Sequence, residues 1–407
     1  MKILLINKFL YAKGGDATAT LATGELLKKK GHEVIFWGMN HPLNPPYEYQ
    51  RYFVENIDFN ESAGIFRKIE LALNVFYSFE AEKKFEKLVA SNRPDLIHLN
   101  NFAHQISPSI LNVIKRRGIA AVMTMHDYKM VCPSYSMLAG GKPCERCKGG
   151  RFYQCFINKC TKDSYLKSLI NTLEMYLHHN ILHIYDPISV FISPSEFMKN
   201  KLEEMGFRGK IARLPYPLMV EKFEPVYGSE SRSVVYFGRL SREKGLFTLI
   251  DAFKYVEEAR LKIIGDGPLK DALISKANSQ KASNVEFLGY KKGEDLKREI
   301  KNSIFTVIAS ECYENFPMSV MESFAFGKPV VGSRIGGIPE LVKDGQTGIT
   351  FEPGNAYDLA SKIRYLAKSP EKVIEMGKNA RKMVEDEFNG EKHYEGLMAI
   401  YEEALKK

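Results

Sequence analysis

The feature that most constrains the fold is an alternation between short apolar, β-branched runs and longer segments with helical periodicity. Parallel strands joined by helical crossovers produce this order, so the chain is predicted to be an α/β protein. In the first half, strands are expected at 3–7, 33–37, 95–99, 119–125, 189–192 and 210–214. Helices are expected at 17–30, 107–117, 163–182 and 195–205. Together they predict one doubly wound domain.

The same alternation begins again after the Pro-containing stretch 214–225. Strands are expected at 233–237, 259–264, 285–288, 303–309, 329–331 and 347–351, and helices at 245–258, 370–388 and 390–405. A length of 407 residues suits two or three domains. We predict an N-terminal domain at 1–215 with a Cys-rich insertion at 132–160, a second domain at 216–385 and a terminal helix at 386–407. Ligands of such folds bind at the carboxyl ends of the strands.

The net charge of +9 is unevenly distributed. Through Arg213 there are 29 Lys/Arg against 20 Asp/Glu, whereas the remainder has 29 of each. The first half is therefore expected either to face an anionic partner, such as phospholipid, a phosphorylated substrate or nucleic acid, or to carry a solvated basic face. The sequence shows neither a membrane-spanning apolar run nor a signal-peptide pattern at its start, so we expect a cytoplasmic protein.

Glycines and cations follow several predicted strands. Gly14 and Gly15 precede the first helix, where they suit either a phosphate or acceptor loop or a simple turn. The second domain opens with Gly238-Arg-Leu-Ser-Arg-Glu-Lys-Gly245, in which Arg239 and Lys244 are candidates for binding phosphate oxygens. Gly265-Asp-Gly-Pro268 follows the next strand. Three loops suited to anions at strand ends indicate a binding edge.

Two glutamates stand in the most informative segment. Glu314 follows a predicted strand, and Glu322 lies seven intervening residues later, inside a predicted helix. The residues between them are mostly apolar, so this is no ordinary charged surface. One carboxylate can approach a reacting carbon, and the other can accept hydrogen bonds from ribose hydroxyls.

From Tyr236 to Val342 these motifs, together with Gly336-Gly-Ile-Pro-Glu340, resemble in kind and order those of the retaining "group 1" (family 4-like) glycosyltransferases. That family includes glycogen and sucrose-phosphate synthases. The resemblance extends over nearly the whole chain and implies two facing Rossmann-like domains of the GT-B type with a cleft between them. The first would be the acceptor side, the second would bind the nucleotide-sugar, and the terminal helix would cross back to the first.

The resemblance also implies roles for individual residues. Arg239 and Lys244 would neutralise the donor diphosphate, Glu322 would hold the ribose, and Glu314 and His126 would contact the transferred sugar. It further implies that sugar and phosphate face the backbone around a run of four residues, Asn315, Phe316, Pro317 and Met318.

In this family the acceptor is thought to attack from the face that the phosphate leaves, so no strong base is needed. Because the chain has no Asp-x-Asp pair, no metal or other cofactor is expected in catalysis. The family's His-x-His and Lys-x-Gly-Gly-Leu patterns are replaced here by His98-Leu-Asn100 and Lys13-Gly-Gly-Asp16. These departures leave the acceptor contacts open and disfavour glucan elongation.

Five of the six cysteines lie between Cys132 and Cys160. Their spacing is compatible with a structural zinc site, with disulfides or with buried thiols. The candidate zinc ligands are Cys144, Cys147, Cys155 and Cys160.

The helical region 159–183 combines an apolar stripe with lysines and histidines. Such a helix lies either on an anionic membrane surface, where the protein would be peripheral, or against its own domain.

We therefore predict transfer of a hexose or N-acetylhexosamine from a UDP- or GDP-sugar to a glycan acceptor, including one carried on a lipid. The alternatives are a sugar-nucleotide epimerase on the same architecture and a nucleic-acid-binding protein. The second is disfavoured, and no nucleic-acid partner is expected, because no base-reading or stacking motif accompanies the basic charge. The dinucleotide glycine fingerprint of NAD-dependent oxidoreductases is absent.

Overall fold

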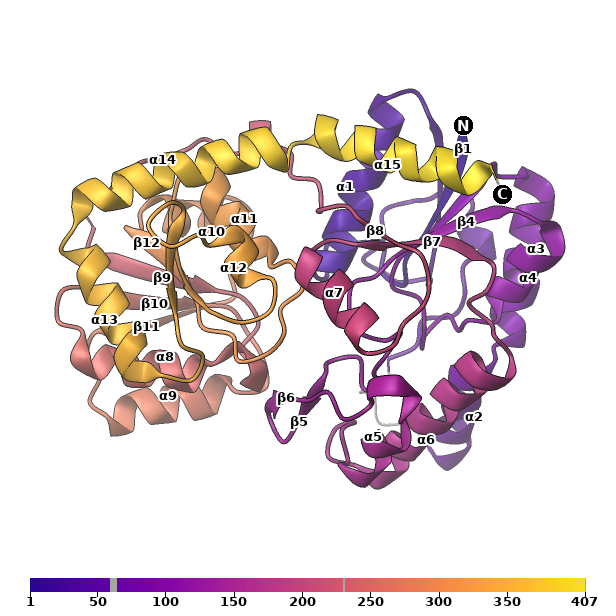
Figure 1. Ribbon diagram of the computed structural model, residues 1–407, viewed down its shortest axis with the longest axis horizontal. Coiled ribbons are helices and arrows are strands. Elements are labelled where there is room, and N and C mark those ends of the chain that lie inside the picture. The colour runs from indigo at the N-terminus through magenta and orange to yellow at the C-terminus, as the bar shows by residue number, and fades with distance from the viewer. Residues whose placement is uncertain (59–63, 230, 407) are drawn as a thin grey trace. The chain divides into compact units, whose positions relative to one another are not determined.

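The computed structural model describes residues 1–58, 64–229 and 231–406, and the chain divides into two compact units. Unit 1 comprises Met1–Ser136, Glu145–Pro217 and Gly390–Lys407, and unit 2 comprises Met137–Cys144 and Leu218–Asn389. Each unit contains a six-stranded parallel sheet with helices packed around it (Figure 1). The prediction of two Rossmann-like α/β domains is confirmed. No helix among the described residues is long and apolar enough to cross a membrane.

The sheet of unit 1 has the order β2-β1-β3-β4-β7-β8. Its strands alternate little between apolar and polar residues because both faces are covered by helices. The chain leaves β1 toward β2 on one side and then returns to β3 on the other, so the strand order reverses between β1 and β3. The strands are β1 (Lys2–Ile6), β2 (Glu33–Trp37), β3 (Leu96–Leu99), β4 (Ala120–Thr124), β7 (Ile188–Ser193) and β8 (Ile211–Arg213).

The helices of unit 1 come from both ends of the chain. The terminal helix α15 packs on α1, β4 and β7. Inside the unit, His98 Nδ1 lies 2.7 Å from the Tyr401 hydroxyl, which fixes α15 to the sheet. The helices are α1 (Gly15–Lys29), α2 (Ile65–Phe76), α3 (Phe79–Asn92), α4 (Ile110–Arg117), α5 (Tyr153–Ile157), α6 (Tyr165–Tyr176), α7 (Glu196–Glu204) and α15 (Gly390–Leu405).

The sheet of unit 2 has the order β11-β10-β9-β12-β13-β14, and its order reverses between β9 and β12. Val234, Leu261 and Phe305 are fully buried and join the strands to the surrounding helices. The strands are β9 (Ser233–Phe237), β10 (Arg260–Ile264), β11 (Val285–Gly289), β12 (Phe305–Ile308), β13 (Val330–Ser333) and β14 (Gly348–Phe351). The helices are α8 (Leu246–Ala252), α9 (Lys270–Ser279), α10 (Gly293–Lys301), α11 (Met318–Ala325), α12 (Ile338–Leu341), α13 (Ala356–Ala367) and α14 (Pro370–Glu387).

Several predicted elements need correction. The helix expected at 163–182 is α6 followed by a π-helical turn at Leu177–Ile181, and the helix expected at 245–258 ends at Ala252 and continues as a short 3-10 turn. Helices α2 and α3 were not predicted. The hairpin of β5 (Leu138–Ala139) and β6 (Lys142–Pro143) lies in the Cys-rich insertion yet groups with unit 2.

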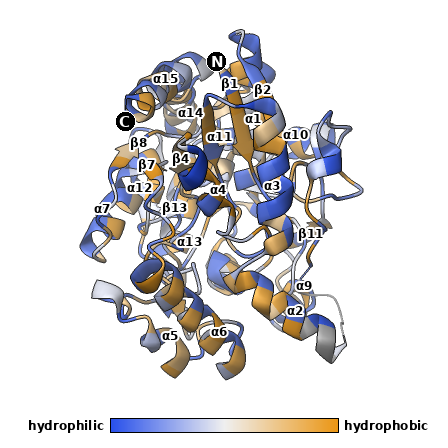
Figure 2. Ribbon diagram, turned by 90° about the vertical axis from the view of Figure 1, so that its right-hand side faces the viewer, coloured by the Kyte–Doolittle hydropathy of each residue, from blue (hydrophilic) through white to orange (hydrophobic). Residues whose placement is uncertain are grey.

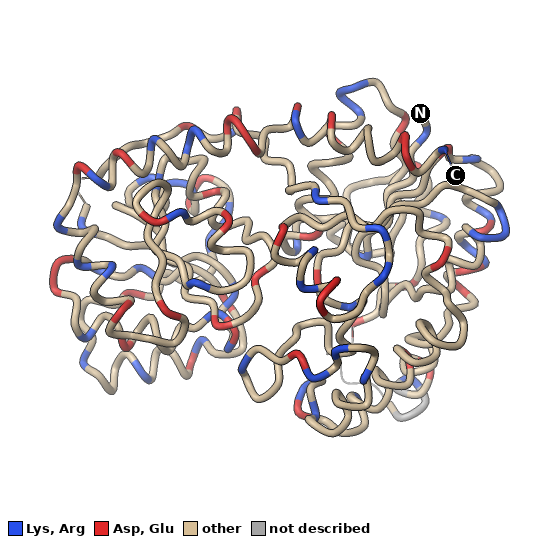
Figure 3. Tube along the Cα trace, in the orientation of Figure 1, with Lys and Arg blue, Asp and Glu red and all other residues tan. Residues whose placement is uncertain are grey.

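Figures 2 and 3 show the distribution of hydropathy and charge along the chain. Strand β1 is orange in Figure 2, whereas α5 and α6 mix apolar and polar residues along their length. Lys and Arg positions occur along both units in Figure 3, interspersed with Asp and Glu.

Candidate active site

The carboxyl ends of β9, β10 and β12 come together because the strand order of unit 2 reverses between β9 and β12. Backbone hydrogen bonds hold the three loops in place. The Leu240 amide donates to the Asp266 carbonyl at 2.9 Å, joining the loops after β9 and β10. The Glu311 amide donates to the Glu243 carbonyl at 2.8 Å, joining the loops after β12 and β9. A reversal of this kind is where open α/β sheets bind ligands.

Lys244 and Glu314 form the central ion pair at this edge. The Lys244 ammonium donates to Glu314 Oε1 at 2.6 Å, and the Ser310 hydroxyl donates to the same oxygen at 2.6 Å. Burial raises the pKa of Glu314, but the charge of Lys244 outweighs it and holds that pKa below its ordinary value. Burial likewise opposes the ammonium of Lys244, yet Glu314 raises its pKa above the ordinary value. Both groups are therefore charged near neutral pH.

Arg239 and two glycines complete the edge. Gly238 and Arg239 are exposed directly after β9, and Gly265 is buried directly after β10. A Cβ atom on Gly265 would lie 1.9 Å from the Gly238 carbonyl oxygen, and its φ is +148°, so no other residue fits there. The loops after β9 and β10 therefore approach closely, and Arg239 is exposed on the first of them.

Contacts with Gly336 and Phe388 fix the loop that carries Glu314. Gly336 has φ +62°, and a Cβ atom there would lie 2.5 Å from the Glu314 amide nitrogen. The Phe316 ring is buried and meets the Phe388 ring edge-on, with 5.5 Å between centroids. Pro317 precedes the first turn of α11, which begins at Met318. Asn315 lies half-buried within the same loop.

Glu322 lies in α11, half-buried, one and a half turns beyond the Glu314 loop. Burial raises the pKa of its carboxyl to about 7. A carboxylate held in this way is costly to bury when ionised, so it suits a position where ligand hydroxyl groups supply hydrogen bonds.

Unit 1 carries a second polar edge, after β1, β3 and β4, where its own strand order reverses. A cavity of about 170 Å³ lies there and includes Lys8, Asn100, His126, Asp127 and Lys129 in its lining. His126 Nε2 lies 3.0 Å from Asn100 Oδ1, and Nδ1 lies 2.7 Å from the Tyr216 hydroxyl. Burial lowers the pKa of His126 to about 4, so its ring is neutral at pH 7.

The neutral ring has one proton, so the bonds assign Nε2–H as donor to Asn100 and Nδ1 as acceptor from Tyr216. Both nitrogens are therefore hydrogen-bonded, so a sugar hydroxyl can bind His126 only by replacing Asn100 or Tyr216. Asn100 is buried, and its amide nitrogen has no hydrogen-bond partner. That orphan donor points to a bound polar group in the cavity.

The sequence did not single out Lys8, Asp127 or Lys129. Burial lowers the pKa of Lys8 and raises that of Asp127. The sequence signal that could have identified Lys8 and Asp127 was their position, because both follow the ends of strands, as Gly238 and Glu314 do. Gly14 and Gly15 lie exposed at the start of α1, whose first turn holds Asp16, bonded to Asn101 at 3.0 Å.

The structure does not assemble the candidate zinc site. None of the six cysteines, all of which lie within the described residues, forms a disulfide, so the disulfide interpretation is wrong for this structure. Nowhere in the described ranges do three His, Cys, Asp or Glu side chains converge as a metal site requires. Cys155 and Cys160 are adjacent, and their hydrogen bond lowers the pKa of Cys155 to about 7. Cys144 and Cys147 therefore do not complete a four-thiolate set with them.

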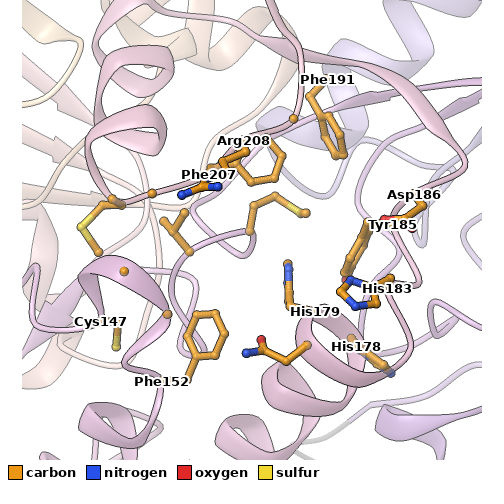
Figure 4. Close-up of a pocket in the computed structure, with 18 of the residues that line it drawn as sticks. Cys147, Phe152, His178, His179, His183, Tyr185, Asp186, Phe191, Phe207 and Arg208 are labelled. Atoms are coloured by element: carbon orange, nitrogen blue, oxygen red, sulfur yellow. The ribbon is translucent and has the colours of Figure 1, made fainter.

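A separate cavity of about 600 Å³ lies beside the amino-terminal ends of β7 and β8 (Figure 4). Phe152, His178, His179 and Tyr185 are among the side chains drawn around it. Of the predicted site residues, its lining includes only Cys147. Its lining shares only Met130 with that of the cavity after β1, β3 and β4.

The geometry defines a pair of Rossmann-like units, each with a polar edge at its strand-order reversal. Comparison with known families gives the class. Residues 13–218 match "Glycosyltransferase Family 4", and residues 220–383 match "Glycosyl transferases group 1". The chain belongs to this glycosyltransferase family, as the sequence motifs predicted. The match favours glycosyl transfer over the epimerase and nucleic-acid alternatives.

Individual relatives agree with this assignment. An N-acetyl-α-D-glucosaminyl L-malate synthase of Bacillus anthracis is 32% identical over 402 residues, which cover 97% of this chain and 95% of that protein. An uncharacterized glycosyltransferase of Methanocaldococcus jannaschii is 32% identical, but that match covers 42% of this chain and 47% of the relative, so the chain spans about half the length of that protein.

Two solved structures share the fold. Sucrose-phosphate synthase from Thermosynechococcus elongatus has a TM-score of 0.74 at 19% identity, with 98% of each chain covered. Anabaena HepE in complex with UDP and glucose has a TM-score of 0.68 at 16% identity, with 99% of each chain covered. At these identities the likeness shows the architecture of two Rossmann-like domains.

Proposed function

We propose that this glycosyltransferase moves a hexose or N-acetylhexosamine from a UDP- or GDP-sugar to a glycan acceptor carried on a lipid, with retention of anomeric configuration. The half-buried ion pair of Lys244 and Glu314, with the exposed Arg239 on the same loop as Lys244, carries the proposal. Departure of a nucleoside diphosphate develops negative charge, and these two fixed cations can stabilise it without rearranging solvent.

The carboxylates have separate tasks in this proposal. Glu314 holds Lys244 in place and accepts hydrogen bonds from hydroxyls of the transferred sugar. Glu322 accepts them from the ribose, which offsets the cost of ionising its buried carboxyl. At the polar edge of unit 1, Asn100 and His126 are groups that can contact a polar ligand. The acceptor hydroxyl attacks the anomeric carbon as the bond to the phosphate breaks, and its proton passes to the departing phosphate.

Relatives support a nucleotide-sugar donor. Anabaena HepE was solved with UDP-glucose, and TarM of S. aureus with UDP and α-GlcNAc-glycerol. The name of the Bacillus anthracis relative specifies an N-acetyl-α-D-glucosaminyl product. These names favour a uridine nucleotide and either glucose or N-acetylglucosamine over other donors.

A thermal-shift titration with UDP-, GDP- and ADP-sugars tests the donor. The preferred donor should raise the melting temperature in a concentration-dependent manner. Arg239→Gln should abolish most of that rise, whereas Arg260→Gln, an exposed arginine at the start of β10, should leave it unchanged. No shift with any nucleotide-sugar would contradict the proposal.

A further inference from the structure

Helix α6 is turned with its apolar side outward. Leu166, Leu169 and Leu173 lie three and four residues apart and therefore share one face. Their exposed fractions are 68%, 36% and 50%. An apolar stripe of this kind normally faces the core of its own domain. Here it is left at the surface.

The opposite face of α6 is polar and buried. Asn171 donates to the Pro133 carbonyl at 3.2 Å, and Glu174 forms an ion pair with buried Lys129. Glu174 Oε1 also lies 3.0 Å from His178 Nδ1. Turning the helix to bury its leucines would leave the buried Lys129 without its carboxylate partner, Glu174, which is strongly unfavourable. The inner contacts therefore fix the apolar stripe outward.

Neighbouring helices extend this stripe into a surface. Helix α6 packs on α5 and α2. Ile157 on α5 is 56% exposed and Leu73 on α2 is 62% exposed. Figure 2 shows apolar residues along all three helices. We call this set the α6 surface, and it consists of Ile69, Leu73, Tyr153, Ile157, Tyr165, Leu166, Leu169 and Leu173.

Basic residues border the α6 surface. Lys159 and Lys167 are exposed, and the Lys159 ammonium lies 4.4 Å from the centre of the Tyr165 ring. Arg151 is exposed at the start of α5. Among the described residues of α2, α5, α6 and the segment that joins α5 to α6, the exposed acids are Glu70 and Asp163, and Glu70 is paired with Arg67. Basic charge around an apolar centre matches the charge of an anionic phospholipid surface.

We propose that the α6 surface docks this protein on an anionic phospholipid bilayer. The leucines enter the interfacial region and the lysines contact the lipid phosphates, so association is peripheral and reversible. The docking stands apart from the transfer reaction. The use of this docking for a lipid-borne acceptor rests on the proposed function. The structural connection is Lys129, which pairs with Glu174 on the inner side of α6 and also lines the cavity beside His126.

Vesicle flotation of the full chain tests the docking. Vesicles of equal parts phosphatidylglycerol and phosphatidylcholine should bind the protein at low salt, whereas pure phosphatidylcholine should bind little. Leu166→Ser with Leu173→Ser should lower binding by about tenfold or more. Lys159→Ala and Lys167→Ala should each lower it by about fivefold. The matched controls, Leu43→Ser and Lys115→Ala, change exposed residues elsewhere in unit 1 and should leave binding unchanged.

Three outcomes would overturn the docking. They are equal binding to neutral and anionic vesicles, full binding by the double leucine variant, and a dimer in light scattering that this variant converts to a monomer. The last would make the α6 surface an interface between copies of the chain. A nucleotide-sugar thermal shift on the same variants keeps this outcome separate from the proposed function, since the shift should be unaffected.

Discussion

At the scale of single residues, the ion pair of Lys244 and Glu314 sets the first prediction. In the proposed reaction, Lys244→Met removes one of two cations that face the developing diphosphate charge, so kcat/KM should fall by about 100-fold to 1,000-fold. Initial rates at limiting donor measure it. Lys254→Met, an exposed lysine on the same unit, is the control and should change the rate less than twofold. A similar small effect for Lys244→Met would remove Lys244 from the catalytic edge.

Glu322 gives a prediction with opposite effects on stability and binding. Its folded pKa of about 7 lies above the value of 4.5 for a free carboxyl, so the folded state binds its proton more tightly than the unfolded state. Its contribution to stability is therefore lost as pH rises between these two values. Glu322→Gln should melt higher than the parent at pH 8, with the difference shrinking toward pH 5, and yet should bind the nucleotide more weakly. Melting curves across pH with and without UDP measure both effects.

The element scale shows what the sequence could and could not predict. The periodicity predicted every strand of the two six-stranded sheets, because buried parallel strands are continuous apolar runs. It also predicted the loops that hold Arg239, Lys244 and Glu314. It could not predict the orientation of α6, because a stripe of leucines has the same periodicity whether it faces the core or the surface. That orientation depends on Lys129, which is 45 residues from Glu174 in the sequence. The bonds that occupy His126 depend on Tyr216, 90 residues away.

Helix α15 supplies the prediction at this scale. Tyr401 is fully buried, and its hydroxyl lies 2.7 Å from His98 Nδ1, whose ring also lies 2.7 Å from Thr124 Oγ1. Tyr401→Phe leaves a buried ring nitrogen without a partner, so the free energy of unfolding should fall by about 1–3 kcal/mol. Urea denaturation followed by circular dichroism measures it. Tyr394→Phe, on the same helix but half-buried, should cost less, and equal losses would contradict the role of the His98 contact.

At the scale of the whole molecule, each unit gathers polar side chains at the edge where its strand order reverses. Unit 2 brings Arg239 and Lys244 to its edge, and unit 1 places His126 beside Lys8 and Lys129 at its own. The excess of nine positive charges belongs to the first half of the sequence, whereas the second half is balanced. Arg239 and Lys244 lie in the second half, where basic and acidic residues are equal in number. Their presence at the edge of unit 2 therefore does not follow from a general excess of basic residues.

The last prediction concerns the stereochemistry and the metal requirement of the whole enzyme. In the proposed mechanism Arg239 and Lys244 neutralise the diphosphate in place of a divalent cation, and the sequence has no Asp-x-Asp pair to hold one. We expect full turnover in EDTA and a product with the anomeric configuration of the donor, as attack from the face of the departing phosphate requires. Proton NMR of the product and initial rates with EDTA or added manganese measure the two expectations. An inverted product, or activity lost in EDTA and restored by manganese, would show that these side chains do not stabilise the leaving group alone.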